Sequence, residues 1–210
     1  MTSRIDAKLL IERLAATRPP EDPRAVELPA ATRSWPADLA ASLATELTPA
    51  AVLIPVFERE VGLTVLLTER SAALRHHAGQ IAFPGGRMEA HDVDVAMTAL
   101  RETHEEVGID PGQVAVAGYL QPMPTITGFA VTPVVGVVEP TALIMIDRTE
   151  VQEAFEVPLD FLLDAGNECR GQREYQGRRI PVVEFRYERF RIWGATAHML
   201  RELREIVLKQ

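Results

Sequence analysis

Apolar residues follow two kinds of spacing along the chain. Short runs of mainly apolar residues, bounded by glycine, proline or charged residues, are typical of buried strands. They predict strands at residues 50–57, 63–67, 114–120, 131–138, 155–157, 182–187 and 190–193. Apolar residues three and four positions apart, or a proline at a helix start, are typical of amphipathic helices. These signals predict helices at residues 4–16, 37–46, 158–163 and 195–208.

The order of these elements predicts an α/β protein in two parts. Strands and helices in this order favour a mixed sheet with helices on both faces. Residues 1–48 carry two short helices separated by prolines, and we expect them to form an N-terminal accessory helical segment. That segment packs on the main domain or on a partner, and a homodimer is one such arrangement. Residues 49–210 form the main domain in this prediction.

The segment from Phe83 to Ile109 combines a glycine turn with an acidic helix. Asp92 or Asp94 is placed to cap the start of the helix, and Gly108 is placed to end it in a left-handed conformation. At about 100° per residue, one stripe of the helix is expected to be buried. Its members are Val93, Ala96, Leu100, Thr103 and Val107.

Three glutamates, Glu102, Glu105 and Glu106, cluster on the other side of this helix, in its last turns. The helix dipole disfavours carboxylates there, and like charges one turn apart repel each other. A divalent cation would reverse both effects, because hard cations such as Mg²⁺ prefer carboxylate oxygens. The alternative is a solvated acidic face. The glycine turn, the C-terminal placement and Arg101, one turn before Glu105, favour the cation site.

A basic run lies directly upstream, within residues 66–86. Its basic members, with one more just after the turn, are Arg70, Arg75, His76, His77 and Arg87. Taken alone, such a run is a solvated loop. Beside a cation site, arginines offer planar forks for phosphate oxygens, and glycines let the backbone approach closely. A metal site made by the two histidines is disfavoured, because carboxylates suit a hard cation better.

Composition narrows the class of protein. The net charge of −8 argues against a general nucleic-acid binder, which usually has a basic surface. The hydrophobic content of 47% supports a folded core. A single cysteine, Cys169, excludes an intrachain disulfide and suits a reducing compartment. Charges interrupt the apolar residues near the N-terminus and no apolar run is long enough for a membrane span, so we expect a cytoplasmic protein without membrane partners.

The glycine turn and the acidic helix resemble the Nudix box, whose pattern is G-x5-E-x7-R-E-U-x-E-E-x-G-U, with U an apolar residue. The match begins at Gly86 and ends with the run R-E-T-H-E-E-V-G-I at residues 101–109. Asp92 stands where the pattern has its first glutamate, the following spacer is one residue longer, and Thr103 occupies an apolar position. The run that carries the metal-binding glutamates in that family is intact.

The upstream run sharpens this resemblance. Residues 66–86 fit the pattern LLTxRSxxLRxHxGQxxFPGG, which is similar to the coenzyme A pyrophosphatase branch of Nudix hydrolases. Aspartate in the first glutamate position and the longer spacer also occur in that branch. The resemblance covers roughly residues 50–208. It implies a Nudix-like α/β/α sandwich with a mixed β-sheet.

The resemblance also implies roles for individual residues. The ligands of Mg²⁺ or Mn²⁺ would be Glu102, Glu105, Glu106 and a main-chain oxygen at Gly85 or Gly86. The same three glutamates would carry catalysis, with Glu105 the first candidate for a base in place of a ligand, and with Arg101 orienting the array. The substrate-binding residues would be Arg70, Arg75, His77, Gly79, Gln80, Gly85 and Gly86. An auxiliary loop acid would be Glu150 or Glu153, and each is otherwise a solvated residue at a helix start.

Together these roles imply a metal-dependent pyrophosphohydrolase. Its substrate would be coenzyme A or a thioester of it, cleaved to 3′,5′-ADP and a 4′-phosphopantetheine species. The same chemistry on ADP-ribose, a nucleotide sugar or a dinucleoside polyphosphate is an alternative. A module that binds a nucleotide without hydrolysing it is another. A purely structural protein with an acidic helix would leave the glutamate cluster unexplained.

Overall fold

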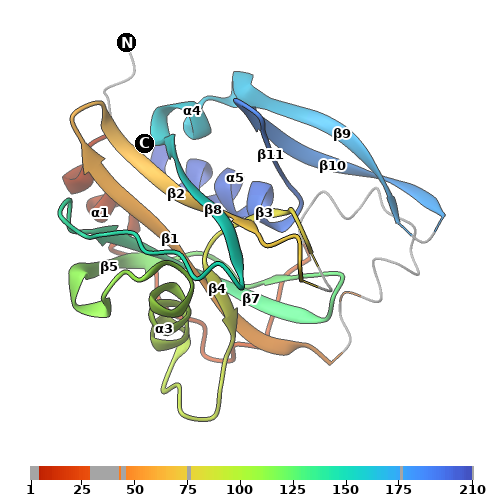
Figure 1. The fold of residues 1–210 in the computed structure, drawn as a ribbon, viewed down its shortest axis with the longest axis horizontal. Helices are drawn as coiled ribbons and strands as arrows, with labels where there is room; N and C mark the ends of the chain where they lie inside the picture. Colours follow the sequence, from red (N-terminus) through yellow and green to blue (C-terminus); the bar gives the residue numbers. More distant parts are fainter. Residues whose placement is uncertain (1–4, 29–42, 44–45, 75–76, 176, 210) are drawn as a thin grey trace.

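The computed structural model describes residues 5–28, 43, 46–74, 77–175 and 177–209. Figure 1 shows a central sheet with helices on both sides and a long β9–β10 hairpin that projects from the body. No helix in these ranges is long and apolar enough to cross a membrane. The elements, including two 3-10 helices (η), are α1 (Ala7–Leu14), β1 (Thr48–Arg59), β2 (Gly62–Arg70), β3 (Ile81–Ala82), β4 (Gly85–Arg87), α3 (Val95–Val107), η2 (Pro111–Gln113), β5 (Val114–Tyr119), β6 (Met123–Pro124), β7 (Phe129–Val138), β8 (Val151–Pro158), α4 (Leu159–Leu163), η3 (Ala165–Asn167), β9 (Glu168–Tyr175), β10 (Arg178–Tyr187), β11 (Phe190–Trp193) and α5 (Ala195–Leu208).

The larger of the two sheets is mixed. Its strands lie in the order β3-β2-β1-β7-β5, with β4 paired to β1, β6 to β7 and β8 to β2. β1 and β7 run parallel along their whole paired length, and the other pairs are antiparallel. β1 and β2 form a hairpin, in which Arg59 pairs with Gly62. A smaller antiparallel sheet has the order β11-β10-β9.

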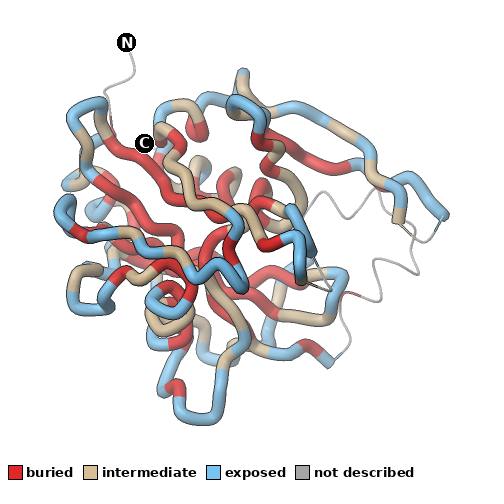
Figure 2. Tube along the Cα trace, viewed as in Figure 1, coloured by how far each residue is buried: buried red, intermediate tan, exposed pale blue. Residues whose placement is uncertain are grey.

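Alternate residues of β1 face two different layers. Ile54 and Val56 join the core that holds α1, α4 and α5, whereas Ala51 and Leu53 pack against α3. A strand that is covered on both faces needs apolar residues at every position, which explains the continuous apolar run. Figure 2 shows the buried residues concentrated in the strands between these layers. The predicted α/β/α sandwich with a mixed sheet is confirmed.

Helix α1 belongs to the main core. Leu10 and Leu14 are fully buried, in the same cluster as residues of α5. The hydroxyl of Thr17, just after the helix, accepts a hydrogen bond from the main-chain N–H of Tyr119 at 2.8 Å. The N-terminal segment therefore covers the edge strand β5 of its own chain. The second helix expected in this segment, at residues 37–46, lies largely outside the described residues.

The sequence pattern did not predict β9. Its residues are mainly polar and charged, half of them are exposed and none is buried, so no apolar run marks them. β9 pairs with β10 from Arg178↔Tyr175 to Phe185↔Glu168. Pairing with a neighbour whose apolar residues are buried makes this segment a strand, because strand preference depends more on context than on composition.

The buried stripe of α3 differs from the predicted one. Val93 is 82% exposed and lies in the turn before the helix, which begins at Val95. Of the predicted stripe only Thr103 and Val107 are buried. The buried residues of the helix are Val95, Thr98, Ala99, Thr103, Glu106 and Val107. This shift of the buried face brings one carboxylate, that of Glu106, to the protein side of the helix.

Candidate active site

Helix α3 has the two ends that its sequence requires. The carboxylate of Asp94 accepts a hydrogen bond from the N–H of Met97 at 2.8 Å and so caps the first turn. Gly108 adopts a left-handed conformation, with φ 74°, and donates to the carbonyl of His104 at 2.9 Å. Of the two predicted caps, Asp94 is correct. Asp92 has a different role, which the sequence analysis missed.

Asp92 anchors Arg101 from a buried position. Nε and Nη2 of Arg101 donate to Oδ1 and Oδ2 of Asp92 at 3.0 and 2.9 Å. The hydroxyl of Thr98 and the N–H of Glu89 donate to the same carboxylate. These hydrogen bonds, chiefly those from Arg101, hold the pKa of Asp92 well below its ordinary value. The guanidinium is thereby fixed in place.

The other edge of Arg101 faces two of the three glutamates. Its Nη1 donates to Oε1 of Glu102 at 2.9 Å and to Oε2 of Glu105 at 3.1 Å. The Glu105 side chain is 56% exposed, whereas that of Glu102 is mostly buried. Burial raises the pKa of Glu102 above its ordinary value, against the opposing effect of Arg101. Arg101 has the contacts that the proposed orienting role requires.

Glu106 points into the protein. Only 3% of its side chain is exposed, the N–H of Gly85 donates to its Oε2 at 3.3 Å, and Nη1 of Arg70 lies 3.5 Å from its Oε1. Burial raises the pKa of Glu106 to about 8, because the loss of hydration outweighs the attraction of Arg70. The charge of Glu150 raises the pKa of Glu106 further.

The glycines of the turn let β4 pass between β1 and α3. A Cβ at Gly85 would overlap the carbonyl oxygen of Ala51, and one at Gly86 would overlap the carboxylate of Glu102. A side chain at Gly85 would clash with the main chain of β1, and one at Gly86 would displace the Glu102 carboxylate. The main chain of the turn is therefore held against the carboxylates of Glu102 and Glu106.

The donor atoms around this turn fit a divalent cation. They are carboxylate and main-chain oxygens, which hard cations prefer. The carboxylates of Glu102 and Glu106 lie against Gly86 and Gly85, and the pKa values of both are raised. A positive charge at this point would stabilise their ionised forms. Within the described residues, no three His, Cys, Asp or Glu side chains already converge as a metal-binding group. Glu105 would have to turn away from Arg101 to bind the same cation as Glu102 and Glu106.

Arg70 ends β2 and begins the basic loop. Main-chain hydrogen bonds close the root of the loop, from Arg70 N to Gln80 O and from Gly79 N to Arg70 O, both at 3.0 Å. His77 has a left-handed backbone and places Nδ1 2.8 Å from Oε1 of Gln80. The structure thus gathers these four predicted substrate-binding residues in one closed loop beside the acidic helix. Arg75 lies outside the described residues.

The two candidates for the auxiliary acid differ in position. Glu150 is exposed just before β8, and its charge raises the pKa values of both Glu102 and Glu106. Glu153 lies within β8 and forms an ion pair with Arg189 of the β10–β11 turn. Of the two, only Glu150 acts on the pKa values of Glu102 and Glu106, whereas Glu153 is paired with Arg189.

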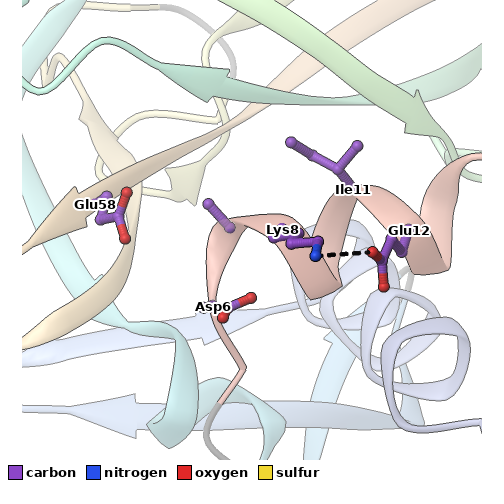
Figure 3. Close-up of a pocket in the computed structure, with 6 residues that line it drawn as sticks. Asp6, Lys8, Ile11, Glu12 and Glu58 are labelled. Carbon is purple, nitrogen blue, oxygen red and sulfur yellow. Dashed lines mark ion pairs between the residues drawn. The ribbon is translucent and has the colours of Figure 1, made fainter.

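A hollow of about 450 Å³ lies elsewhere, between α1 and the end of β1. Figure 3 shows Asp6, Ile11 and Glu58 around it, with Lys8 and Glu12 paired at 3.9 Å. None of the predicted site residues lines this hollow. The candidate active site is the glycine turn with its glutamates.

The sequence of the chain, including the residues of this site, is similar to those of known proteins. The sequence model of the NUDIX domain matches residues 47–174. The chain belongs to the Nudix hydrolase family. A relative from Citrobacter koseri, named as the uncharacterized Nudix hydrolase NudL, is 46% identical over 155 residues, which cover 73% of this chain and 80% of the relative. A NudL from Salmonella paratyphi B is 45% identical over the same shares of the two chains.

Solved structures of Nudix proteins resemble the chain in part. The Nudix hydrolase RenU from M. smegmatis has a TM-score of 0.47 and 26% identity, covering 55% of this chain and 73% of its own. The predicted family and enzyme class are confirmed by the sequence matches: this Nudix hydrolase acts on pyrophosphate bonds. Enzymes of the family generally need divalent cations.

Proposed function

We propose that this Nudix hydrolase cleaves the diphosphate of coenzyme A or its thioesters, with Mg²⁺ or Mn²⁺ as cofactor. The products are 3′,5′-ADP and a 4′-phosphopantetheine species. The observation that carries the proposal is the 3.5 Å contact between Arg70 and Glu106. It joins the loop that resembles the coenzyme A branch to the helix of the Nudix box. An anionic substrate held by the loop would therefore lie beside the carboxylates.

Arg70 is suited to hold a phosphate oxygen. Its Nε is buried without a hydrogen-bond partner among the described residues. A buried donor without an acceptor is costly, and an anionic oxygen at this position would satisfy it. His77, Gly79 and Gln80 belong to the same closed loop, which gives substrate recognition a fixed frame.

Hydrolysis requires neutralised phosphate oxygens, an activated water and a stabilised leaving phosphate. Glu102, Glu106 and the main-chain oxygen of Gly86 would hold the cation, which supplies the neutralising positive charge. Glu105 would be a further ligand where it does not act as the base. Arg101 keeps the carboxylates oriented, because Asp92 fixes its guanidinium.

The proton of the attacking water needs an acceptor. Glu105 is our candidate base, since its side chain is 56% exposed and open to water, and Glu150 is our auxiliary acid. Water attacks one phosphorus, the bond from that phosphorus to the bridging oxygen breaks, and the second phosphate leaves with that oxygen.

The sequence composition supports the proposed class of substrate and the proposed cellular compartment. The small-molecule substrate, rather than nucleic acid, suits a net charge of −8. The cytoplasm, as a reducing compartment, suits an exposed free thiol at Cys169. A homodimer is compatible with the fold, although the N-terminal helix packs on its own chain.

The test compares kcat/KM for coenzyme A, ADP-ribose and NADH, each with Mg²⁺ or Mn²⁺. We expect coenzyme A to be preferred, and Arg70→Gln to lower its kcat/KM by about tenfold or more because a charge-assisted phosphate contact is lost. The exposed Arg24→Gln serves as the matched control and should leave kcat/KM unchanged. Preference for ADP-ribose or NADH would reject the substrate, and tight nucleotide binding without hydrolysis would indicate a binding module.

A further inference from the structure

A ring of contacts links helix α3, residues 147–150 and the end of β2 at residues 70–71. The N–H of Asp147 donates to the carbonyl of Glu106 at 2.9 Å, and the N–H of Glu150 donates to the carbonyl of Asp147 at 3.1 Å. The N–H of Ser71 then donates to the carbonyl of Glu150 at 2.8 Å. Arg70, the residue before Ser71, closes the ring through its 3.5 Å contact with the Glu106 carboxylate. Two segments far apart in sequence thus frame Glu150.

Asp147 joins the two sides of this ring, because its main chain is hydrogen-bonded to both Glu106 and Glu150. Its Oδ1 accepts hydrogen bonds from the N–H and the hydroxyl of Thr149, both at 2.8 Å. Its carbonyl also accepts the N–H of Val151 at 2.8 Å, where β8 begins. An aspartate that binds the N–H two residues on fixes a tight turn. The main chain of Glu150 is therefore linked to that of Glu106 through Asp147.

That link matters because the Glu150 side chain itself is exposed. An exposed carboxylate can adopt many rotamers, so the main chain decides which groups it reaches. The negative charge of Glu150 acts on both Glu102 and Glu106. Without the turn, the acid would swing away from the glycine turn where the cation is expected to bind.

We propose that Asp147 is a positioning residue that ties the main chain of Glu150 to that of Glu106 and so keeps the Glu150 charge near Glu102 and Glu106. Through this placement it sets both the affinity of the site for a divalent cation and the rate of hydrolysis. The inference rests on the proposed function of the glutamate site. It assigns Asp147 no contact with the substrate, because its carboxylate is committed to the turn.

The test uses two variants of Asp147 and one control variant in a similar turn elsewhere. Asp147→Ala removes the acceptor, and we expect kcat to fall about tenfold with little change in KM, the size seen when the support of a metal-binding residue is lost. Mn²⁺ affinity, measured from the electron paramagnetic resonance of free Mn²⁺, should weaken severalfold. Asp147→Asn keeps an oxygen acceptor and should restore both values. Asp164→Ala breaks a matched turn, in which Oδ1 accepts the Gly166 N–H at 2.8 Å, and should change neither.

A double-mutant cycle decides whether Asp147 acts through Glu150. If it does, Asp147→Ala should have no further effect on Mn²⁺ affinity or kcat once Glu150→Gln is present. Additive losses, an unaffected Asp147→Ala or an equal loss in Asp164→Ala would overturn the inference. Failure of the proposed function is distinguishable, because a wild-type protein that cleaves no coenzyme A still permits the cycle on Mn²⁺ binding. A wild-type protein that binds no Mn²⁺ would overturn both.

Discussion

Asp92 and Arg101 lie nine residues apart in sequence and meet in a bidentate pair, with distances of 3.0 and 2.9 Å. The Asp92 side chain is fully shielded from solvent, so the pair is rigid. The opposite edge of the same guanidinium holds Glu102 and Glu105. A buried aspartate before the helix thus controls the geometry of carboxylates near its end.

Replacing Arg101 by lysine should impair catalysis despite the conserved charge. One ammonium cannot reproduce the planar fork that bridges Asp92, Glu102 and Glu105. We expect kcat/KM for the diphosphate substrate to fall about a hundredfold, as when catalytic groups are misplaced by about 1 Å. Arg186→Lys, an exposed arginine paired with Glu184 on the smaller sheet, is the control. Equal kcat/KM in Arg101→Lys and wild type would show that the fork has no orienting role.

The pH dependence of the free energy of unfolding should reveal how much the Asp92–Arg101 ion pair stabilises the protein. The folded state holds the pKa of Asp92 below its ordinary value, so the ionised pair stabilises the protein above about pH 4. That stabilisation is lost as the pH falls through the lowered folded value. Urea unfolding of wild type and Asp92→Asn should therefore differ in free energy near pH 7 and converge in strong acid. A difference that stays constant with pH would mean that the Asp92 charge contributes nothing.

Alanine at Gly86 should abolish activity. Its Cβ would occupy the space of the Glu102 carboxylate, so that side chain has to swing away from the turn. We expect kcat to fall about a hundredfold or more, since the carboxylates lose their position on the turn. Gly166→Ala is a milder control, because its Cβ would meet only the Asp164 side chain, at 3.2 Å. Full activity in Gly86→Ala would exclude the close approach of the turn to the glutamates.

The N-terminal helix should contribute to stability rather than to catalysis. Leu14 is fully buried against the main core, and truncation to alanine should lower the free energy of unfolding by roughly 2–5 kcal/mol. Ile11, on the same helix but 42% exposed, should cost much less when replaced by alanine. Denaturant unfolding of both variants checks this expectation. Similar small losses would indicate that α1 is only loosely attached.

Much of the fold was predictable because strands buried on both faces need continuous apolar residues. β1 and β7 follow this rule, and the predicted ranges lie within the observed strands. β9 has no such apolar run, and its polar residues form a strand because they pair with β10. The short strand β4 depends on Gly85 and Gly86 fitting between β1 and α3, a tertiary contact that no local pattern encodes.

The site was predictable in its chemistry and less so in its arrangement. Three carboxylates at a helix C-terminus are unfavourable without a cation, and that argument needs only the sequence. Which glutamate points inward depends on the phase of the helix, and the predicted stripe began at the exposed Val93 instead of Val95. The role of Asp147 depends on contacts with Glu106 and Glu150 that form only in the folded chain.

Product identification tests the central claim most directly. The wild-type protein is incubated with coenzyme A and Mg²⁺ in ¹⁸O-labelled water, and the products are analysed by mass spectrometry. We predict equal amounts of 3′,5′-ADP and 4′-phosphopantetheine, one of them carrying a single labelled oxygen. Glu106→Gln should slow their release by about a hundredfold or more, whereas Glu12→Gln on the remote helix α1 should not. Intact coenzyme A, or loss of the 3′-phosphate alone, would contradict the account.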